Sequence, residues 1–333
     1  MTTVRDVQAP LRLLITGGAG FIGSHVCRHF LAQQAEVWVL DNFSTGRVDN
    51  LPADGAGLKV ITADVRDADC MTQAGLGTAP LHAIVHLAAQ TSVPRSLQAP
   101  LEDAEINYGG ALRMLDFARQ QSPSPVVVFA SSAAVYGDVE GLAQVGVSAL
   151  RPCSPYGLHK WAVEEAMRLY ANSYALSSMA LRFFNVYGPR QDPSSPYSGV
   201  ISQFMARAAA GEPLTIHGDG TQTRDFIYVD DVVQAIAKAV HRALRHAGGQ
   251  GAFACCNVAT GRSQSIRTLA EGVAAVFGRP VDLRFAATRA GDIRHSRADV
   301  ACLARLLGLQ THRDLQAGLA QTAQWYRQAG CDA

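Results

Sequence analysis

The chain has 333 residues, a net charge of +1 and only 17% charged residues. This length suits one large globular unit, or a main domain with a smaller second lobe, and it allows a substantial buried core. The near-neutral balance, without a basic block, argues against nucleic acid as a partner, although a few local arginines are enough to bind a small anion.

The beginning of the chain and its cysteines indicate the compartment. MTTVRDVQAP has no apolar core of a signal peptide. No apolar run reaches the roughly 18 residues that a membrane span requires. The seven cysteines are irregularly spaced and form neither a CxxC pair nor a Cys/His cluster, which favours reduced, mostly buried thiols and no metal site. We therefore expect a cytoplasmic protein without a membrane partner.

The first half alternates short apolar runs with helical patterns. Near-continuous apolar runs predict strands of a parallel sheet covered on both faces; they span 11–16, 36–41, 58–63, 82–87 and 125–131. Helices are expected at 21–33 and 100–121. This alternation predicts an α/β fold with a Rossmann-type doubly wound parallel sheet.

The pattern loosens after residue 150. A helix is predicted at 156–174 and a strand at 178–184, before the Pro/Ser/Gly-rich stretch 187–199. Further helices are predicted at 200–210, 230–246, 265–277, 299–307 and 312–328, and strands at 213–217, 253–258 and 281–285. We expect 1–184 to form the main domain, which also receives strand segments near 213–260, and 185–333 to form mainly a smaller, interleaved α/β lobe.

A glycine-rich turn follows the first predicted strand. In LLITGGAGFIGSH, Gly17, Gly20 and Gly23 stand between that strand and the next helix. Such glycines allow a tight turn and close approach to a pyrophosphate, which the helix N-terminus then binds. With both flanking elements present, the motif predicts a dinucleotide site.

Two aspartates end the second and third strands. Asp41, 24 positions after Gly17, can accept hydrogen bonds from ribose hydroxyls and would repel a 2′-phosphate, which favours NAD over NADP. Asp64 could face the adenine edge by the same logic. Singly, either would be an ordinary turn residue.

Tyr156 and Lys160 lie four apart at the start of a predicted helix and therefore share a face. A phenol is a poor base at neutral pH. A neighbouring ammonium and a positive nicotinamide ring would both favour the phenolate and lower its pKa. Such a Tyr/Lys pair often arises by chance on a solvated helix. It indicates a catalytic site only in combination with the glycine turn and with Ser132 at the end of the fifth strand.

Taken together, these motifs closely resemble the extended short-chain dehydrogenase/reductase family, specifically its NAD-dependent nucleotide-sugar epimerase/dehydratase branch. The resemblance covers nearly the whole chain. It rests on TGGAGFIGSH, LDNFSTG, ADVRD, VHLAA, SSAAVYG, YGLHK, RFFNVYGPRQDP, GDGTQTRDFIYVDDV and RAGDIRHSRAD.

The resemblance implies roles for individual residues. Tyr156 would be the base, Lys160 would hold the nicotinamide ribose, and Ser132 would bind the reacting oxygen. The cofactor would be contacted by Gly17, Gly20, Phe21, Ile22, Gly23, Asp41, Asn42, Ser44, Thr45, Gly46, Asp64, Val65, Leu87, Ala88, Ala89, Asn107, Tyr156, Lys160 and Phe183. The substrate would be contacted by Ser92, Ser132, Tyr156, Asn185, Val200, Ile201, Leu214, Ile216, Arg224, Arg289, Asp292 and Ser296.

Ala133 and Ala134 narrow the reaction. Members that eliminate water resemble this chain but have Asp-Glu at these two positions, and uronic acid decarboxylases have Glu at the second. Elimination across C5–C6 needs a further acid and base, which two methyl groups cannot supply. The remaining chemistry is C4 epimerisation through a transient 4-keto sugar, with NAD regenerated in every cycle.

Ser296 bears on the size of the sugar. Epimerases limited to plain hexoses resemble this segment but have a tyrosine there, so serine leaves room for an N-acetyl group at C2. The resemblance therefore implies UDP-N-acetylglucosamine and UDP-N-acetylgalactosamine. It also implies that Arg224 and Arg289 bind the diphosphate, that Asp292 binds the uridine ribose, and that the protein is a homodimer formed through a four-helix bundle.

Several alternatives stay open. The substrate could be plain UDP-glucose/UDP-galactose or the N-acetylglucosaminuronate pair. A net 4-keto sugar reductase is disfavoured by Asp41, although Arg47 keeps NADP in question. A non-catalytic NAD-binding sensor is disfavoured because Ser132, Tyr156 and Lys160 are all present.

Overall fold

The computed structural model describes residues 10–53, 55–71, 80–139, 141–193, 199–278, 280, 282–288, 293–311 and 313–329. The chain divides into two compact units. Unit 1 comprises Met1–Val135, Ser154–Arg182 and Val233–Cys256, and unit 2 comprises Tyr136–Cys153, Phe183–Val232 and Asn257–Ala333. Each unit is therefore assembled from segments far apart in the sequence.

Unit 1 is built on a seven-stranded sheet in the order β10-β6-β5-β4-β1-β2-β3. The strands are β1 (Arg12–Thr16), β2 (Glu36–Asp41), β3 (Leu58–Thr62), β4 (Ala83–His86), β5 (Val126–Ser132), β6 (Ser178–Phe183) and β10 (Phe253–Val258). The pairs β1–β2, β2–β3, β1–β4 and β4–β5 are parallel. The chain order reverses between β1 and β4, which opens a crevice at their carboxyl ends. The predicted doubly wound fold is confirmed.

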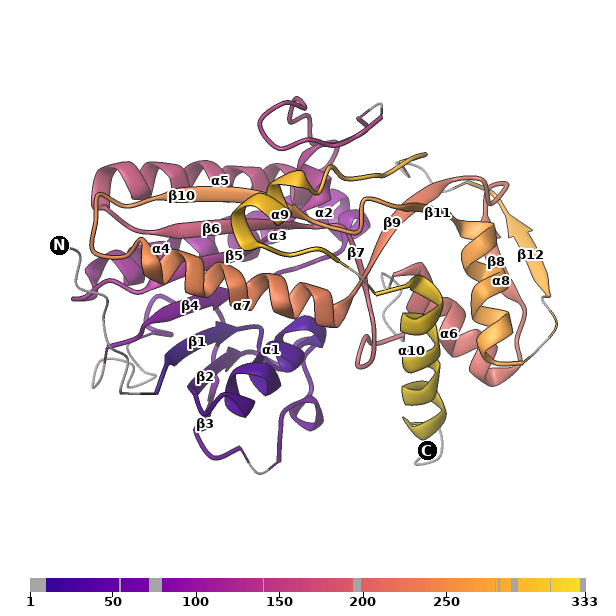
Figure 1. Cartoon of the computed structure of the whole chain (residues 1–333), viewed down its shortest axis with the longest axis horizontal. Helices are drawn as coiled ribbons and strands as arrows, with labels where there is room; N and C mark the ends of the chain where they lie inside the picture. The colour runs from indigo at the N-terminus through magenta and orange to yellow at the C-terminus, as the bar shows by residue number, and fades with distance from the viewer. Residues whose placement is uncertain are drawn as a thin grey trace. The chain divides into compact units, whose positions relative to one another are not determined.

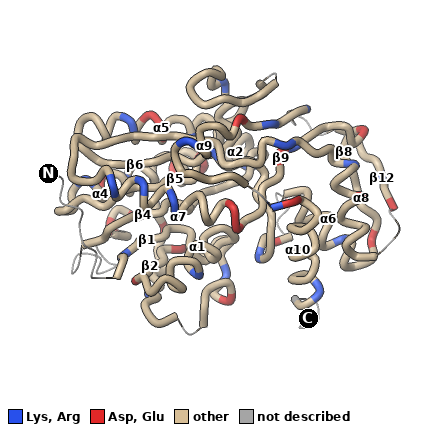
Figure 2. Tube along the Cα trace, in the orientation of Figure 1, with Lys and Arg blue, Asp and Glu red and all other residues tan. Residues whose placement is uncertain are grey.

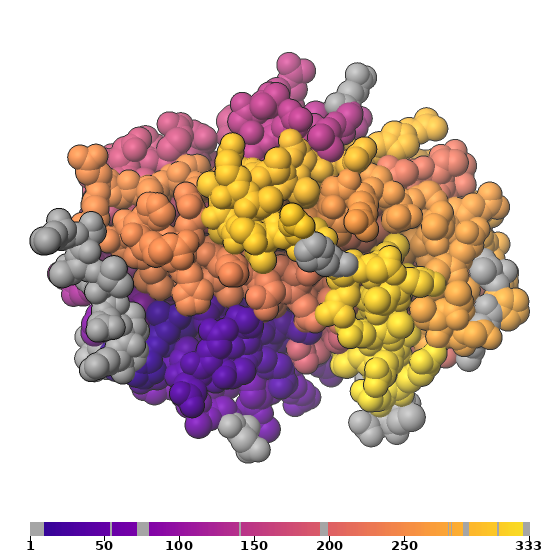
Figure 3. All heavy atoms as spheres, in the orientation of Figure 1, coloured from indigo at the N-terminus to yellow at the C-terminus, as the bar shows by residue number. Residues whose placement is uncertain are grey.

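Helices cover both faces of this sheet. They are α1 (Phe21–Ala32), α2 (Val93–Gln98), α3 (Pro100–Asp103), a π-helical segment (Ala104–Gly109), α4 (Gly110–Gln120), α5 (Pro155–Tyr174) and most of α7 (Val229–Arg245). On the α4 and α5 side, Met114 and Met167 pack with Leu14, Ile84 and Phe129 of the strands. Figure 1 shows α7 crossing the front of the sheet, and in Figure 3 its orange surface adjoins the indigo N-terminal segment.

Unit 2 contains two small sheets with helices. The sheets have the orders β11-β9-β7 and β12-β8. Their strands are β7 (Asn185–Tyr187), β8 (Leu214–His217), β9 (Thr223–Tyr228), β11 (Ser263–Ser265) and β12 (Leu283–Ala286), and the helices are α6 (Val200–Ala210), α8 (Ile266–Val276), α9 (Ala301–Leu307) and α10 (Leu315–Ala329). The sequence did not predict β7, β9 or β11.

Charged residues are spread along the described trace, with acidic and basic positions interspersed (Figure 2). Within the part of the chain that the structure describes, no helix is both long enough and apolar enough to cross a membrane.

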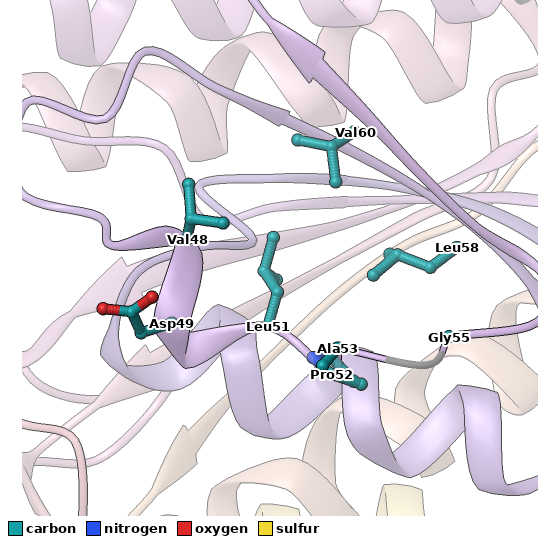
Figure 4. Close-up of a pocket in the computed structure, with 8 residues that line it drawn as sticks. All are labelled: Val48, Asp49, Leu51, Pro52, Ala53, Gly55, Leu58 and Val60. Carbon is teal, nitrogen blue, oxygen red and sulfur yellow. The ribbon is translucent and has the colours of Figure 1, made fainter.

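A surface pocket of about 530 Å³ lies beside β3 in unit 1 (Figure 4). Val48 and Val60 at this pocket are 66% and 47% exposed. The lining residues are Val48, Asp49, Leu51, Pro52, Ala53, Gly55, Leu58 and Val60. None of them is among the residues predicted for the site, so this pocket is separate from that set.

Candidate active site

The glycine-rich turn lies at the end of β1, where backbone segments approach closely. Gly17 has φ of +69°, and a Cβ there would lie 2.7 Å from the backbone nitrogen of Ala88. A Cβ at Gly23 would lie 2.1 Å from the carbonyl oxygen of Gly17. Gly20 caps α1 without a side chain, which leaves the N–H groups of the first turn, including Phe21 and Ile22, accessible to an anion. The turn therefore fits a pyrophosphate.

Asp41 is oriented beside this turn at the end of β2. Its carboxylate oxygens accept hydrogen bonds from the backbone N–H groups of Ala19 and Phe43, both at 2.9 Å. Each oxygen keeps a lone pair for a ribose hydroxyl. A Cβ at Gly46 would lie 2.9 Å from Asp41 Oδ1, so the loop closes tightly around the carboxylate. Asn42, Ser44 and Thr45 are exposed along the loop.

Asp64 lies next to Asn42, and both residues were predicted to contact the cofactor. The Asp64 carboxylate already accepts hydrogen bonds from two neighbouring side chains. Arg66 donates from its backbone N–H, Nε and Nη2, and Asn42 donates from Nδ2 at 2.7 Å. The hydrogen bonds from Arg66 hold the pKa of Asp64 well below its usual range. Because a carboxylate accepts about four hydrogen bonds, an adenine edge would have to displace one of these donors. Val65, the next residue, is buried.

The predicted catalytic residues meet at the end of β5 and the first turns of α5. Ser132 is the last residue of β5, and its hydroxyl accepts a hydrogen bond from the Ala134 N–H at 3.2 Å. The Ser154 side chain caps α5 by accepting from Gly157 N–H. Tyr156 and Lys160 are both buried, and the Lys160 ammonium lies 5.7 Å from the centre of the Tyr156 ring.

Burial dominates the ionisation of this pair. It raises the pKa of Tyr156 to about 12, while a hydrogen bond with Ser132 lowers it. Burial lowers the pKa of Lys160 to about 8, while the charge of Asp103 raises it. The sequence argument considered the Lys160 ammonium and the nicotinamide ring and left this burial out.

Asn107 belongs to a buried hydrogen-bond network beside this pair. Its Nδ2 donates to the Gln90 carbonyl and to Asp103 Oδ1, both at 2.9 Å. Gln90 follows Leu87, Ala88 and Ala89 at the carboxyl end of β4, the segment predicted to line the cofactor. Ser92 accepts from Arg95 N–H and its own N–H donates to the Gln90 side chain.

In unit 2, the predicted sugar-nucleotide residues gather around β9. Arg224 lies on β9, and its neighbour Thr223 accepts the Ser296 N–H at 3.1 Å. The Ser263 hydroxyl donates to the Ser296 carbonyl at 3.0 Å. Asn185 pairs with Phe226 in the same sheet. Arg289 and Asp292 lie outside the described residues.

The apolar residues predicted around the base are largely core residues of unit 2. Ile201, Leu214 and Ile216 are 2%, 3% and 0% exposed. Val200 begins α6 and is partly exposed. Phe183, predicted to contact the cofactor, is the last residue of β6 and is 8% exposed.

Sequence reasoning missed two sets of polar residues. Asp103 and His159 complete the network around Asn107, with His159 Nδ1 2.6 Å from Asp103 Oδ2. The four-residue spacing of Asp103 and Asn107 on one helix was the available signal. Glu164, one turn beyond Lys160, forms a buried ion pair with Arg182, and nothing in the local sequence indicates that pairing.

Comparison with known proteins identifies the family. Residues 13–253 match the NAD dependent epimerase/dehydratase family. The chain is 38% identical to a UDP-glucose 4-epimerase of Mycolicibacterium smegmatis over 95% of this chain and 99% of the relative.

Two solved structures are also similar. A UDP-N-acetylglucosamine 4-epimerase from Methanobrevibacter ruminantium, in complex with UDP-N-acetylmuramic acid, has a TM-score of 0.88 at 33% identity and covers 97% of this chain and 100% of its own. A Thermus thermophilus UDP-glucose 4-epimerase in complex with NAD has a TM-score of 0.85 at 36% identity, with 96% and 100% covered. These findings confirm the predicted fold class and the predicted cofactor, NAD. The chain belongs to the NAD dependent epimerase/dehydratase family.

Proposed function

We propose that the preferred substrates are UDP-N-acetylglucosamine and its 4-epimer, UDP-N-acetylgalactosamine. The chain is an NAD-dependent UDP-sugar 4-epimerase, the class that its relatives' names give. The observation that carries the narrower proposal is the small side chain of Ser296, whose backbone is fixed to Thr223 and Ser263.

In this proposal, the residues of unit 1 that were predicted to contact the cofactor hold NAD. The turn at Gly17 and Gly23 has no space for side chains, and Asp41 presents a fixed, buried carboxylate, so these residues fit a pyrophosphate and a ribose. When bound, NAD supplies a hydride acceptor and donor for C4 of the sugar and a positive charge near Tyr156.

Tyr156 takes the proton from the sugar 4-hydroxyl and later returns it. Burial raises the pKa of this phenol, so a positive charge close to the ring is needed to favour the phenolate. The Lys160 ammonium contributes part of that charge. Ser132, at the end of β5, holds the reacting oxygen. One group therefore serves as base and then as acid within a single cycle.

Ala133 and Ala134 limit what this site can do. They form a short 3₁₀ turn directly after Ser132, and neither side chain can donate or accept a proton. Without an acid–base pair at these positions, the 4-keto sugar has no catalyst here for elimination across C5–C6. The chemistry that NAD would supply beside these residues is therefore limited to epimerisation at C4.

Binding of the nucleotide is assigned to unit 2. Arg224 would pair with the diphosphate, since its guanidinium offers planar donors. Arg289, Asp292 and Asn185 keep the roles that the resemblance implies. Ser296 would face C2 of the sugar, where the absence of an aromatic ring admits an N-acetyl group.

Plain UDP-glucose and UDP-galactose are the leading alternative, because relatives named UDP-glucose 4-epimerase are as similar as the N-acetylglucosamine enzyme. The test compares kcat/KM for UDP-glucose and UDP-N-acetylglucosamine without added NAD. We expect a higher value for the acetylated sugar. Ser296→Tyr should abolish that activity while sparing UDP-glucose, and the matched Ser296→Ala should spare both. A higher value for UDP-glucose in the wild type would overturn the substrate proposal.

We also propose a homodimer formed through α4 and α5, acting in the cytoplasm. Leu158 and Leu169 of α5 are 46% and 58% exposed, which provides apolar surface for a partner helix pair. Met114 of α4 is only 1% exposed and packs in the core of unit 1, so it does not contribute to this surface. Leu158→Glu and Leu169→Glu together should convert a dimer to a monomer in analytical ultracentrifugation, and a monomeric wild type would contradict the proposal.

A further inference from the structure

We infer that Asp103 is a positioning residue of the proposed active site: its buried carboxylate ties together three segments around Tyr156 and Lys160, and its bond to His159 places a negative charge beside the turn of α5 that carries Lys160. The catalytic meaning of this inference rests on the proposed 4-epimerase function.

Asp103 is 1% exposed, and both oxygens of its carboxylate have partners. Its Oδ1 accepts from Gln90 Nε2 at 2.8 Å and from Asn107 Nδ2 at 2.9 Å. Its Oδ2 lies 2.6 Å from His159 Nδ1. The three partners come from the loop after β4, from the π-helical segment and from α5, so one side chain joins three elements. Buried polar networks of this kind hold side chains in one arrangement.

Each partner of Asp103 adjoins a residue of the proposed site. Gln90 directly follows Ala89 of the segment predicted to line NAD. His159 directly precedes Lys160, so its bond to Asp103 restrains the turn of α5 that carries the ammonium. Asn107 is held by two bonds through Nδ2, while its buried Oδ1 has no hydrogen-bond partner in the described structure.

The charge of Asp103 acts on both members of the catalytic pair. It raises the pKa of Lys160, against the effect of burial, and it also raises the pKa of Tyr156. Other charged or titratable groups near Lys160 do not replace it. Burial, together with the charge of Lys160, lowers the pKa of His86 on β4 to about 3, so His86 is neutral. Glu164 on α5 is already paired with an arginine.

Aromatic rings cannot substitute for this charge either. The Lys160 ammonium lies 4.7 Å from the centre of the Phe129 ring on β5, a contact that favours a cation but contributes less than a full charge in a buried site. Of the described groups named here, Asp103 is therefore the one whose negative charge favours the protonated form of Lys160.

The test follows Lys160 directly by NMR. Lys59, Lys160 and Lys238 are the three lysines of the chain, so protein labelled with ¹³Cε-lysine gives three signals, of which Lys160→Arg identifies one. The Lys160 titration midpoint is measured relative to Lys238 in the wild type, Asp103→Asn and Asp103→Glu. The Asn variant removes the charge, yet its oxygen can still accept from Gln90 and Asn107.

We expect Asp103→Asn to lower the Lys160 midpoint by at least about 0.5 pH unit, and Asp103→Glu to keep it near the wild-type value. Asp116→Asn, which removes an exposed carboxylate on α4, should leave it unchanged. Should Asp103→Asn fail to fold, Asp103→Ser provides the same neutral comparison. An unchanged Lys160 midpoint in the neutral variant would overturn the inference.

Catalysis gives the second readout. Asp103→Asn should lower kcat at least about tenfold while KM changes less than about threefold. Both limbs of the pH profile should also move to lower pH, because removing a negative charge lowers the pKa values of Tyr156 and Lys160. A loss of kcat that is the same at every pH, without this shift, would mean that Asp103 has only a structural role and would contradict the inference. If the wild type epimerised no UDP-hexose, the proposed function would fail, whereas the lysine titration would still decide the role of Asp103.

Discussion

The buried ion pair between Glu164 and Arg182 connects the catalytic helix to the sheet, and its removal gives a sharp test of the packing in unit 1. Glu164 is one turn beyond Lys160 on α5, and Arg182 lies on β6. Their side chains are only 3% and 6% exposed. Arg182→Met keeps much of the side-chain volume but leaves the carboxylate buried without its cation.

The magnitude follows from the bonds that remain. Glu164 accepts from Arg182 Nε at 2.9 Å, from Arg182 Nη2 at 2.6 Å and from Ser131 Oγ at 2.5 Å. Arg182→Met removes the first two and spares the third. Breaking a buried pair on one side costs about 3–5 kcal/mol, whereas replacing both partners by apolar residues is often nearly neutral. The double variant Glu164→Leu/Arg182→Met should therefore recover most of the lost stability.

Urea unfolding of the wild type, the single variant and the double variant measures these free energies. Arg168→Met is the matched control, because Arg168 pairs with Glu165 on the exposed face of the same helix, and it should not change stability measurably. A loss below about 1 kcal/mol for Arg182→Met, or a double variant as unstable as the single one, would refute the reasoning.

Three further predictions concern the proposed chemistry. Tyr156→Phe should lower kcat by about 10²- to 10⁴-fold, as expected for loss of a general base, while NAD released on denaturation stays stoichiometric; loss of NAD as well would indicate a structural defect. Because burial lowers the pKa of Lys160 to about 8, activity that needs the protonated form should fall as the pH rises through about 8. An active Lys160→Arg variant should not show that fall in its pH profile. Gly17→Ala, which adds a Cβ 2.7 Å from the Ala88 nitrogen at φ +69°, should abolish NAD retention in an absorbance assay; Gly249→Ala, whose nearest contact would be 3.7 Å, should retain it.

The central sheet could be predicted because buried parallel strands leave a plain record in the sequence. β1, β2, β4 and β5 are almost wholly buried, so their apolar runs are continuous. The glycine turn was predictable for a similar reason, since close backbone contacts at Gly17 and Gly23 exclude every side chain. The expected helix 100–121 was broadly right, but it comprises α3, a π-helical segment and α4.

The missed elements are those whose stability comes from distant partners. β9 begins with the polar residues Thr223, Arg224 and Asp225, so its sequence has no apolar pattern at this end. The Asp225 carboxylate instead accepts hydrogen bonds from Thr260 and Gly261, which are distant in the sequence. β7 and β11 have three residues each, too few to show a period. The Asp103–His159 pair spans 56 positions, so only the packing of α5 against the preceding helices brings it together.

The most direct test of the central claim follows the hydrogen on C4. UDP-N-acetylglucosamine carrying deuterium at C4 is incubated with the wild-type enzyme in ordinary water, and the 4-epimer is analysed by NMR and mass spectrometry. Transfer to the cofactor and return to the same carbon predicts that the product keeps its deuterium at C4. Loss of the deuterium to solvent, or its appearance on another carbon, would contradict the account.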